Sequence, residues 1–223
     1  MSNLKSDPNY KYICVLDFEA NCAQNMKELH MDNEVIEFPS VLLRYDSEAD
    51  GKIEKISEFQ LYCKPKNKPT LTPFCIELTK ITQDKVNNGV TFPIALKQHE
   101  LWLRSNIPEF DDTFNKNNCI IATCGEWDMM TMAPKEYKNH GIKKVHPVYL
   151  KYVNVKTEFT SFYKIGSKFG MAKMLEYLNL SLDGTHHSGI DDCRNISKIM
   201  INLLENGHQY DKMKIRYVKL DRN

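Results

Sequence analysis

The residues of this 223-residue chain that are best suited to chemistry are four carboxylates and one histidine. Asp17 and Glu19 lie two residues apart at the end of an apolar run, and alternation along a strand would point both side chains to the same face. Asp128 follows a second apolar run, and Asp192 stands five residues after His187. Each has an ordinary alternative: an acidic pair at a strand end can be a solvated edge, and an acid in the first turn of a helix suits the helix dipole.

Taken together, the five groups match what two-metal hydrolysis of a phosphodiester requires. Hard oxygen ligands hold two Mg²⁺ or Mn²⁺ ions about 3.5–4 Å apart, and four carboxylates roughly balance their charge. A histidine that titrates near neutrality can accept the proton of the attacking water. The sequence offers this set of groups.

The hydrophobic pattern indicates which elements position these groups. Strands are predicted over residues 12–18, 35–45, 53–63, 119–123 and 148–155. Helices are predicted over 76–86, 92–103, 171–178 and 189–206. Pro39 suggests an edge position or a bulge in the second strand, and Ser188 with Asp191 resembles a capping box before the last helix, with Gly207 as its stop. This order predicts an α/β fold with a mixed central sheet flanked by helices.

Length and composition are those of one globular domain. The chain is 42% hydrophobic and 26% charged, and no apolar run approaches the roughly 20 residues of a membrane span. Residues 1–11 lack the apolar core of a signal peptide. We therefore expect no membrane partner and a cytoplasmic or nuclear location. The expected organisation is a flexible arm over 1–9, one domain over 10–207 and a basic tail over 208–223.

Cysteines and basic residues exclude some functions and leave others open. The seven cysteines are odd in number and form no C-x-x-C pair, which argues against a disulfide framework and against a structural zinc site formed by them. The net charge is only +1, but lysines and arginines gather locally. These clusters are solvated surface or candidates for phosphate contacts; they comprise Lys64, Lys66 and Lys68, and Lys212, Lys214, Arg216, Lys219 and Arg222.

Three motifs resemble those of the DEDDh branch of the DEDD 3′→5′ exonucleases. Asp17-Phe-Glu19 resembles the first motif, Trp127-Asp128-Met129 the second, and His187-Ser-Gly-Ile-Asp-Asp192 the third. The stretch from Leu71 to Gln83 resembles the segment between the first and second motifs in the subgroup of histone-mRNA and small-interfering-RNA 3′ exonucleases. The resemblance covers roughly residues 10 to 205.

This resemblance implies a ribonuclease-H-like fold and the release of 5′-monophosphates from RNA with a free 3′ end. It implies that Asp17, Glu19, Asp128 and Asp192 hold two metal ions and that His187 activates water. It also implies apolar contacts around the terminal nucleotide, for which stacking suits varied sequence. The candidates for these contacts are Phe18, Ala20, Phe74, Trp127 and Met129. Asp191 lacks the five-residue spacing from His187 and is set aside.

Two alternatives stay open at the level of sequence. One is a DNA 3′→5′ exonuclease acting on single-stranded DNA, because no residue here can be shown to contact a 2′-OH. The other is a catalytically inactive nucleic-acid-binding adaptor on the same fold. The extra nucleic-acid-binding modules of several family members find no match in this sequence, and Glu126 adds a negative charge beside the second motif for which the sequence offers no explanation.

Overall fold

The computed structural model describes residues 10–25, 33–46, 52–108, 110, 118–166, 169–209 and 213–218. Within these ranges, no helix is both long and apolar enough to cross a membrane. The predicted arm over 1–9 and half of the predicted basic tail, namely residues 210–212 and 219–223, lie outside them.

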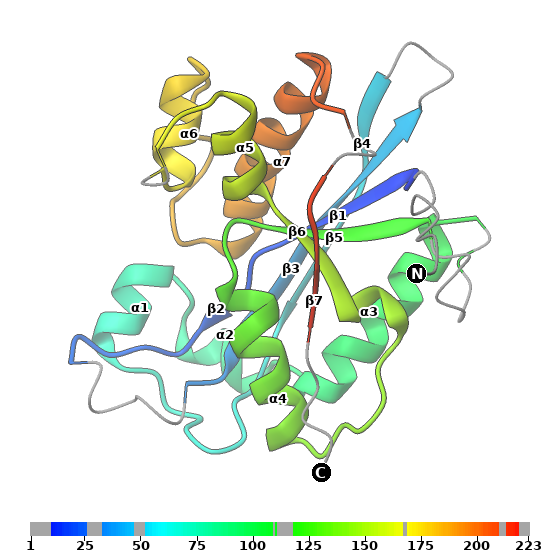
Figure 1. Ribbon diagram of the computed structural model, residues 1–223. Coiled ribbons are helices and arrows are strands. Elements are labelled where there is room, and N and C mark those ends of the chain that lie inside the picture. The colour runs from blue at the N-terminus through cyan, green and yellow to red at the C-terminus, as the bar shows by residue number, and fades with distance from the viewer. Residues whose placement is uncertain are drawn as a thin grey trace.

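A seven-stranded mixed sheet forms the centre of the molecule (Figure 1). Its strand order is β2-β3-β1-β5-β6-β7, and β4 pairs with β3. β1 is parallel to β5, β5 is parallel to β6, and the remaining pairs are antiparallel. The strands are β1 (Tyr12–Leu16), β2 (Glu19–Ala20), β3 (Val35–Asp46), β4 (Lys52–Tyr62), β5 (Cys119–Thr123), β6 (Lys151–Asn154) and β7 (Ile215–Tyr217).

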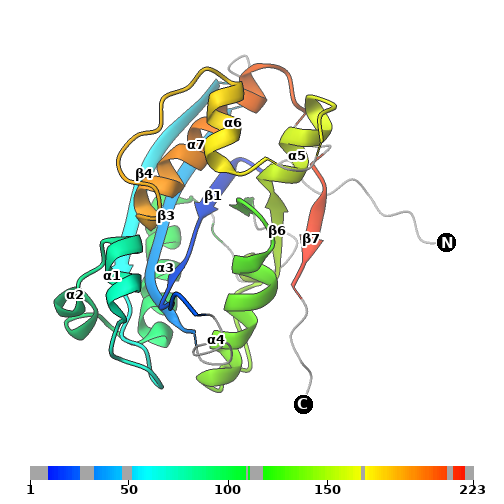
Figure 2. The same cartoon turned by 90° about the vertical axis from the view of Figure 1, so that its left-hand side faces the viewer.

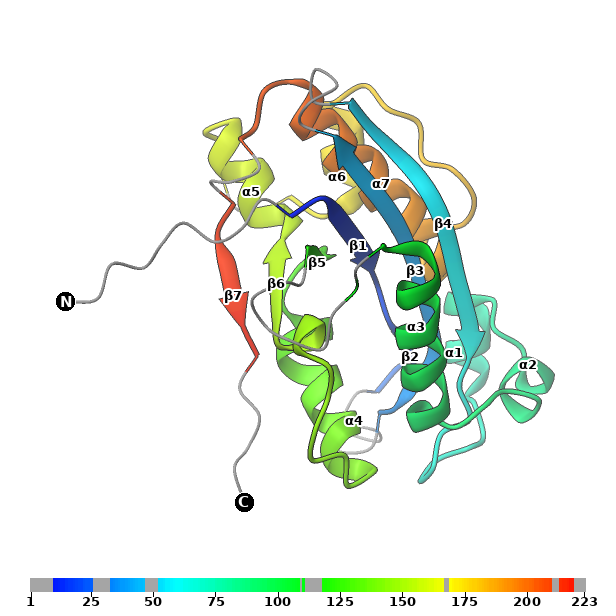
Figure 3. The same ribbon diagram turned by 90° about the vertical axis from the view of Figure 1, so that its right-hand side faces the viewer.

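Helices cover both faces of this sheet, which confirms the predicted α/β class. α3 (Phe92–Asn106) lies on one face, and α7 (Gly189–Glu205) lies on the other (Figures 2 and 3). The other helical segments are α1 (Pro73–Thr79), α2 (Gln83–Asn87), η2 (Asp128–Met132), α4 (Ala133–Asn139), η3 (Pro147–Leu150), α5 (Val155–Phe162) and α6 (Met171–Tyr177).

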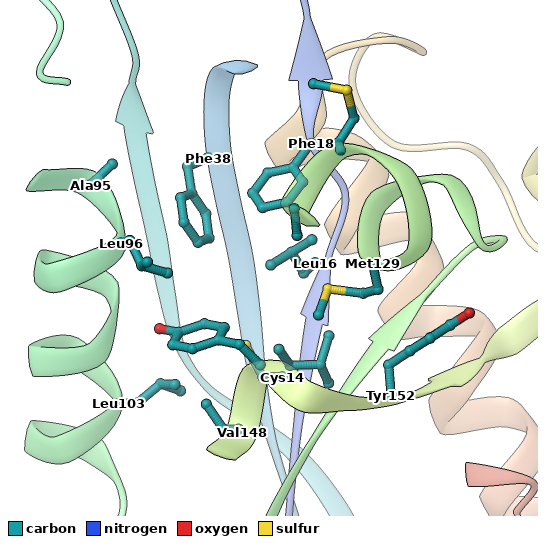
Figure 4. Packing of buried hydrophobic residues seen from close by; sticks show 14 of the residues in the cluster. Cys14, Leu16, Phe18, Phe38, Ala95, Leu96, Leu103, Met129, Val148 and Tyr152 are labelled. Atoms are coloured by element: carbon teal, nitrogen blue, oxygen red, sulfur yellow. The ribbon is translucent and has the colours of Figure 1, made fainter. Parts of the chain in front are cut away.

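Alternation along β1 divides the core into two clusters. Cys14 and Leu16 point towards α3, where they join Phe38 and Phe92 in one cluster (Figure 4). Ile13 and Val15 point to the opposite face, where they pack with residues of α5, α6 and α7. Because β1 is buried on both faces, it is apolar at every position. The charged residues that follow it therefore begin where the sheet ends.

Several predicted elements differ in their limits. The weak helix over 76–86 is two short helices, α1 and α2, each with a threonine cap. The strand over 148–155 is correct only for β6, because Pro147 begins a 3₁₀ turn and Val155 opens α5. Ile215–Tyr217, within the predicted basic tail, form β7 and pair with β6.

The predicted edge position or bulge at Pro39 is wrong. β3 lies between β1 and β4, and its irregularity falls between Leu42 and Leu43. Pro39 is tolerated because β1 ends opposite Ser40, while β2 pairs only with Glu37 and Val35. The missing N–H therefore falls in the gap between two partner strands, where no ladder hydrogen bond is lost.

Candidate active site

Four elements bring the predicted acids to one edge of the sheet. Asp17 directly follows β1, and Glu19 opens β2 after a single intervening residue. Asp128 opens η2, just beyond the end of β5, and Asp192 lies in the first turn of α7. Because β1 and β5 are parallel, their carboxyl ends meet at the same edge, which is where open α/β sheets place their sites.

The four carboxyl groups form one cluster. Ligand oxygens of Asp17, Glu19 and Asp192 all lie within 4.8 Å of one another. Asp128 joins them through its Oδ1, which accepts a hydrogen bond of 2.8 Å from the backbone N–H of Phe18. Asp128 and Asp192 are buried, and Asp17 and Glu19 are partly buried. The structure thus brings together all four acids that the sequence singled out.

Burial raises the pKa values of Asp17, Glu19 and Asp128, and repulsion from neighbouring carboxylates adds to this rise for Asp17 and Glu19. Burial raises the pKa of Glu19 to about 9, with added repulsion from Asp192 and other carboxylates. Burial, then the charge of Asp128, raises the pKa of Asp17 well above its ordinary value. Burial also raises the pKa of Asp128 to about 6, although the N–H of Phe18 counteracts this rise. A protein can maintain such a cluster at neutral pH when cations or protons compensate it.

The donor set fits divalent cations. Carboxylate oxygens converge from several elements at separations that coordination to shared ions would require, and they are hard ligands of the kind that Mg²⁺ and Mn²⁺ prefer. The raised pKa values of Asp17 and Glu19 have the same origin, namely excess negative charge in a buried place. Bound cations would remove that excess, so the residues present fit the expected pair of ions.

The loop before α7 places two histidines beside Asp192. His187 has a left-handed backbone, with φ of 69°, and its N–H donates to Asp192 Oδ2 over 3.0 Å. It is the ring of His186 that contacts this carboxylate, with Nδ1 at 3.1 Å from Oδ1. The two rings stack with centroids 4.0 Å apart. Burial and the neighbouring His186 lower the pKa of His187, so its ring is neutral at pH 7.

The start of α7 is capped by a residue that the sequence analysis missed. Ser188 makes no side-chain cap hydrogen bond, and Asp191 accepts from Thr185 N–H and from Arg194 instead. The predicted capping box is therefore wrong. Glu37, on β3, accepts from the N–H of Gly189 over 3.1 Å. A glutamate in the middle of an apolar strand was the available signal, since such a residue needs a buried partner.

Close packing at Gly189 fixes α7 against the sheet. A Cβ atom at this position would lie 2.8 Å from Pro39 Cγ and 3.1 Å from the Asp17 carbonyl oxygen. Only a glycine therefore lets the helix approach the end of β1, which Asp17 follows. This approach brings Asp192 to the other acids.

A cavity of about 250 Å³ adjoins the acids. It is lined by Phe18, Glu19, Ala20, Asn21, Cys22, Asn33, Leu78, Thr79 and Trp127. Three of the five predicted nucleotide contacts are among these residues. Trp127 is 41% exposed and Phe74 is 36% exposed, although Phe74 does not line this cavity. Met129 is buried in the core cluster below (Figure 4) and offers no surface to a ligand.

Glu126, which the sequence left unexplained, pairs with the C-terminal strand. Its carboxylate forms an ion pair with Arg216 of β7, and Arg216 also donates to Thr157 Oγ1 over 3.1 Å. The charge beside the second motif is thus compensated within the fold, and it ties the turn before η2 to β7.

Comparisons with known proteins agree with this geometry. A sequence model described as Exonuclease, of the RNase T type, matches residues 14–200. The mouse (Mus musculus) protein named 3′-5′ exoribonuclease 1 is 36% identical over 203 residues, which are 90% of this chain and 55% of the mouse protein. The Drosophila melanogaster 3′-5′ exonuclease Snipper is 31% identical over 207 residues, covering 89% of this chain and 71% of Snipper.

Solved structures give the same result. The nuclease domain of 3′hExo, described as a DEDDh family member bound to rAMP, has a TM-score of 0.80 and 33% identity, covering 96% of this chain and all of that one (100%). The structure of cell-death related nuclease 4 has a TM-score of 0.74 and 25% identity, covering 89% of this chain and 65% of that one. The chain spans about half (55%) of the length of the mouse, rat and human exoribonucleases that it matches.

Proposed function

Because the chain belongs to the RNase T-type exonuclease family, we propose that it is a metal-dependent 3′→5′ exoribonuclease that releases 5′-monophosphates. The observation that carries the proposal is the convergence of Asp17, Glu19, Asp128 and Asp192 at one edge of the sheet. An adaptor without catalysis has no need for four acids whose mutual repulsion must be compensated.

The four acids would hold two divalent ions, Mg²⁺ or Mn²⁺. When bound, such a pair lowers the pKa of the attacking water and stabilises the leaving oxygen. Asp128 is oriented by the N–H of Phe18, and Asp192 by the N–H of His187. These backbone donors fix the carboxylates before substrate arrives, so their geometry costs little to organise during the reaction.

His187 would accept the proton of the attacking water on a ring nitrogen. Its lowered pKa leaves the imidazole neutral at pH 7 and so able to act as a base. The left-handed backbone at this residue is unusual for a side chain with a Cβ, and such conformations cluster at functional sites. His186 would orient Asp192 through the contact between Nδ1 and the carboxylate.

The cavity between β2 and α1 would receive the terminal nucleotide. Trp127 offers an exposed ring, and Phe18 and Ala20 supply an apolar wall, which together can grip any base. Phe74 lies exposed on α1 and would contact the neighbouring nucleotide. RNA is proposed as the substrate because relatives at 34–36% identity are named exoribonucleases, and because the solved nuclease domain of 3′hExo is described as bound to rAMP.

Matched single strands of RNA and DNA, each labelled at the 5′ end, test this function. Purified protein with Mg²⁺ or Mn²⁺ should shorten the RNA one nucleotide at a time and release 5′-monophosphates, and EDTA should stop the reaction. Faster shortening of the DNA strand would overturn the choice of RNA. Absence of any product with either ion would overturn the enzyme and favour a binding protein.

Substitution of the two histidines tests the assignment of the base. His187→Ala should lower kcat by about 10²–10⁴-fold, the usual contribution of general base catalysis, and should flatten the acidic limb of the pH–rate profile. His186→Ala should lower kcat by a smaller factor and leave the acidic limb of the pH–rate profile unchanged. The reverse order of effects would transfer the role of base to His186.

A further inference from the structure

A second group of possible metal ligands lies away from the catalytic acids. It consists of Glu34, directly before β3, and of Glu136 and His140 at the end of α4. α4 runs beside the end of the sheet where β3 begins (Figure 2). Glu136 and His140 are four residues apart and so share one side of the helix. Ligand atoms of the three residues lie within 4.8 Å of one another, and none of them belongs to the catalytic cluster.

Glu34 is held in place by a loop that wraps around its carboxylate. Its Oε1 accepts from the N–H of Lys66 over 2.9 Å. Its Oε2 accepts from the N–H groups of Asn67 and Lys68 over 2.8 and 3.1 Å. The side chain is 1% exposed. The position of this carboxylate is therefore determined by backbone donors, and because Oε2 already accepts two hydrogen bonds, Oε1 keeps the lone pair that a cation could use.

Glu136 carries a buried oxygen without a hydrogen bond. Its Oε1 accepts from the N–H of Val35 over 2.7 Å. Its Oε2 is buried and accepts no hydrogen bond from any residue that the structure describes. The Nε2 atom of His140 lies 3.3 Å from this oxygen. An unsatisfied carboxylate oxygen at 1% exposure costs free energy unless a cation or a proton compensates it.

We propose that Glu34, Glu136 and His140 bind a transition-metal ion such as Zn²⁺, which fastens the loop of Lys66 to α4. Two donors that each lie about 2.0–2.1 Å from a tetrahedral zinc ion are about 3.3–3.4 Å apart. This is the separation between Glu136 Oε2 and His140 Nε2. Two carboxylates neutralise a divalent ion, and the imidazole favours zinc or cobalt over magnesium.

The ionisation of the two α4 residues agrees with this assignment. Burial, and then the charge of Glu34, raises the pKa of Glu136 to about 7. Burial and the charge of Lys66 lower the pKa of His140, although Glu34 opposes this effect. A lowered pKa favours the neutral imidazole, which is the form that binds metal ions. The competing arrangement is a proton shared by Glu136 and His140, with Lys66 and Lys135 supplying nearby positive charge.

The chain contains a matched control for this site. Glu158 and His208 form a similar buried pair, with Oε2 and Nε2 3.0 Å apart. There Oε2 is hydrogen-bonded to His208 and Oε1 accepts from the N–H of Lys214. Among the described residues, no second carboxylate joins Glu158 and His208 in a metal-binding group. Substitutions of His140 and His208 thus remove the same side chain from two similar pairs, of which only one is predicted to bind metal.

The experiment measures Zn²⁺ binding to the whole chain by competition with a chromophoric chelator, in excess Mg²⁺. The wild type should bind one more equivalent of Zn²⁺ than His140→Asn and Glu136→Gln. If the two variants still bind this equivalent, their affinity for it should be more than about tenfold weaker, the least loss expected for removing a ligand. His208→Asn should match the wild type. The proposed site would be overturned if both α4 variants bound as many Zn²⁺ ions as the wild type with the same affinity. It would also be overturned if His208→Asn lost as much Zn²⁺ binding as the α4 variants.

Two further measurements keep the test independent of variant folding and of the catalytic site. The His140→Asn loss should persist in an Asp192→Asn background, because Asp192 is a proposed ligand of the catalytic site and the two sites share no ligand. Anomalous scattering at the zinc edge from wild-type crystals soaked in Zn²⁺ should place a peak between Glu34, Glu136 and His140. A peak only at the catalytic acids would overturn the proposal without touching the proposed nuclease function.

Discussion

Glu37 should control the stability of the active site, although it belongs to neither metal cluster. It reaches from β3 to the N–H of Gly189, at the start of the helix that carries Asp192. Its other oxygen accepts from Gln60 Nε2 over 2.7 Å. The perturbation is Glu37→Ala, with Ser188→Ala as its control. Ser188 occupies the normal capping position but makes no cap hydrogen bond.

The expected size of the effect follows from these contacts. Loss of a helix cap costs about 0.5–2 kcal/mol, and a buried donor left without an acceptor costs about 1–3 kcal/mol. Glu37→Ala removes the cap of α7 and leaves the buried N–H of Gly189 without its acceptor, whereas the exposed amide of Gln60 still donates to Tyr62. Because the cap and the acceptor of this N–H are one and the same hydrogen bond, we expect a loss of about 1–3 kcal/mol in the free energy of unfolding. Ser188→Ala should change it by less than about 0.5 kcal/mol.

Urea unfolding in the presence of Mg²⁺ measures the free energy of unfolding of both variants. The metal matters because Glu37 also repels Asp17, and its removal from metal-free protein would relieve that repulsion and mask part of the loss. Exonuclease rates should fall in Glu37→Ala and stay within about twofold of wild type in Ser188→Ala, because only Glu37 orients α7. A larger loss of unfolding free energy in Ser188→Ala than in Glu37→Ala would refute the conclusion that Glu37 of β3 caps α7.

Three other expectations concern residues around the site. Since the pKa of Glu19 is raised to about 9, the metal-free protein should lose stability as pH rises from about 4.5 towards 9. In urea unfolding with EDTA, Glu19→Gln should remove up to about 3 kcal/mol of this loss at pH 7, an upper value because the side chain is partly exposed. An effect of this substitution that does not depend on pH would contradict the expectation. Gly189→Ala should reduce both the exonuclease rate and the melting temperature, because its Cβ would lie 2.8 Å from Pro39 Cγ. A melting temperature measured by calorimetry and a rate that both equal those of the wild type would show that α7 can shift. Arg216→Ala should cost about 1 kcal/mol or less, as for other partly exposed ion pairs, and leave kcat within about twofold; a tenfold loss would show that the pair with Glu126 acts in catalysis.

The limits of prediction are clearest at the two ends of α7. Its apolar period and its stop at Gly207 were evident from sequence, because they depend on local spacing and on a glycine with φ of 89°. Its true cap was not, because Glu37 lies about 150 residues away in the chain and meets Gly189 only after the sheet has folded. Local rules select the nearest serine, whereas the helix accepts whichever buried oxygen packing supplies.

The same division applies to Pro39 and to the histidines. A proline in a strand predicts an edge, but the staggered ends of β1 and β2 leave a gap that accommodates it inside the sheet. The resemblance of its motif to that of the exonuclease family selected His187 as the base. Only the structure shows that the ring contacting Asp192 is that of His186.

The sequence by itself determined the α/β class and the four acids at the edge of the sheet, because strand alternation and helix periodicity are local and the acids follow apolar runs. The tertiary structure alone decided how these acids are held. The N–H donor of Phe18, the cap from Glu37 and the ion pair between Glu126 and Arg216 all join residues whose contacts no local pattern encodes. The grouping of Glu34 with Glu136 and His140 has the same origin, because more than 100 residues separate a strand start from a helix end that only folding brings together.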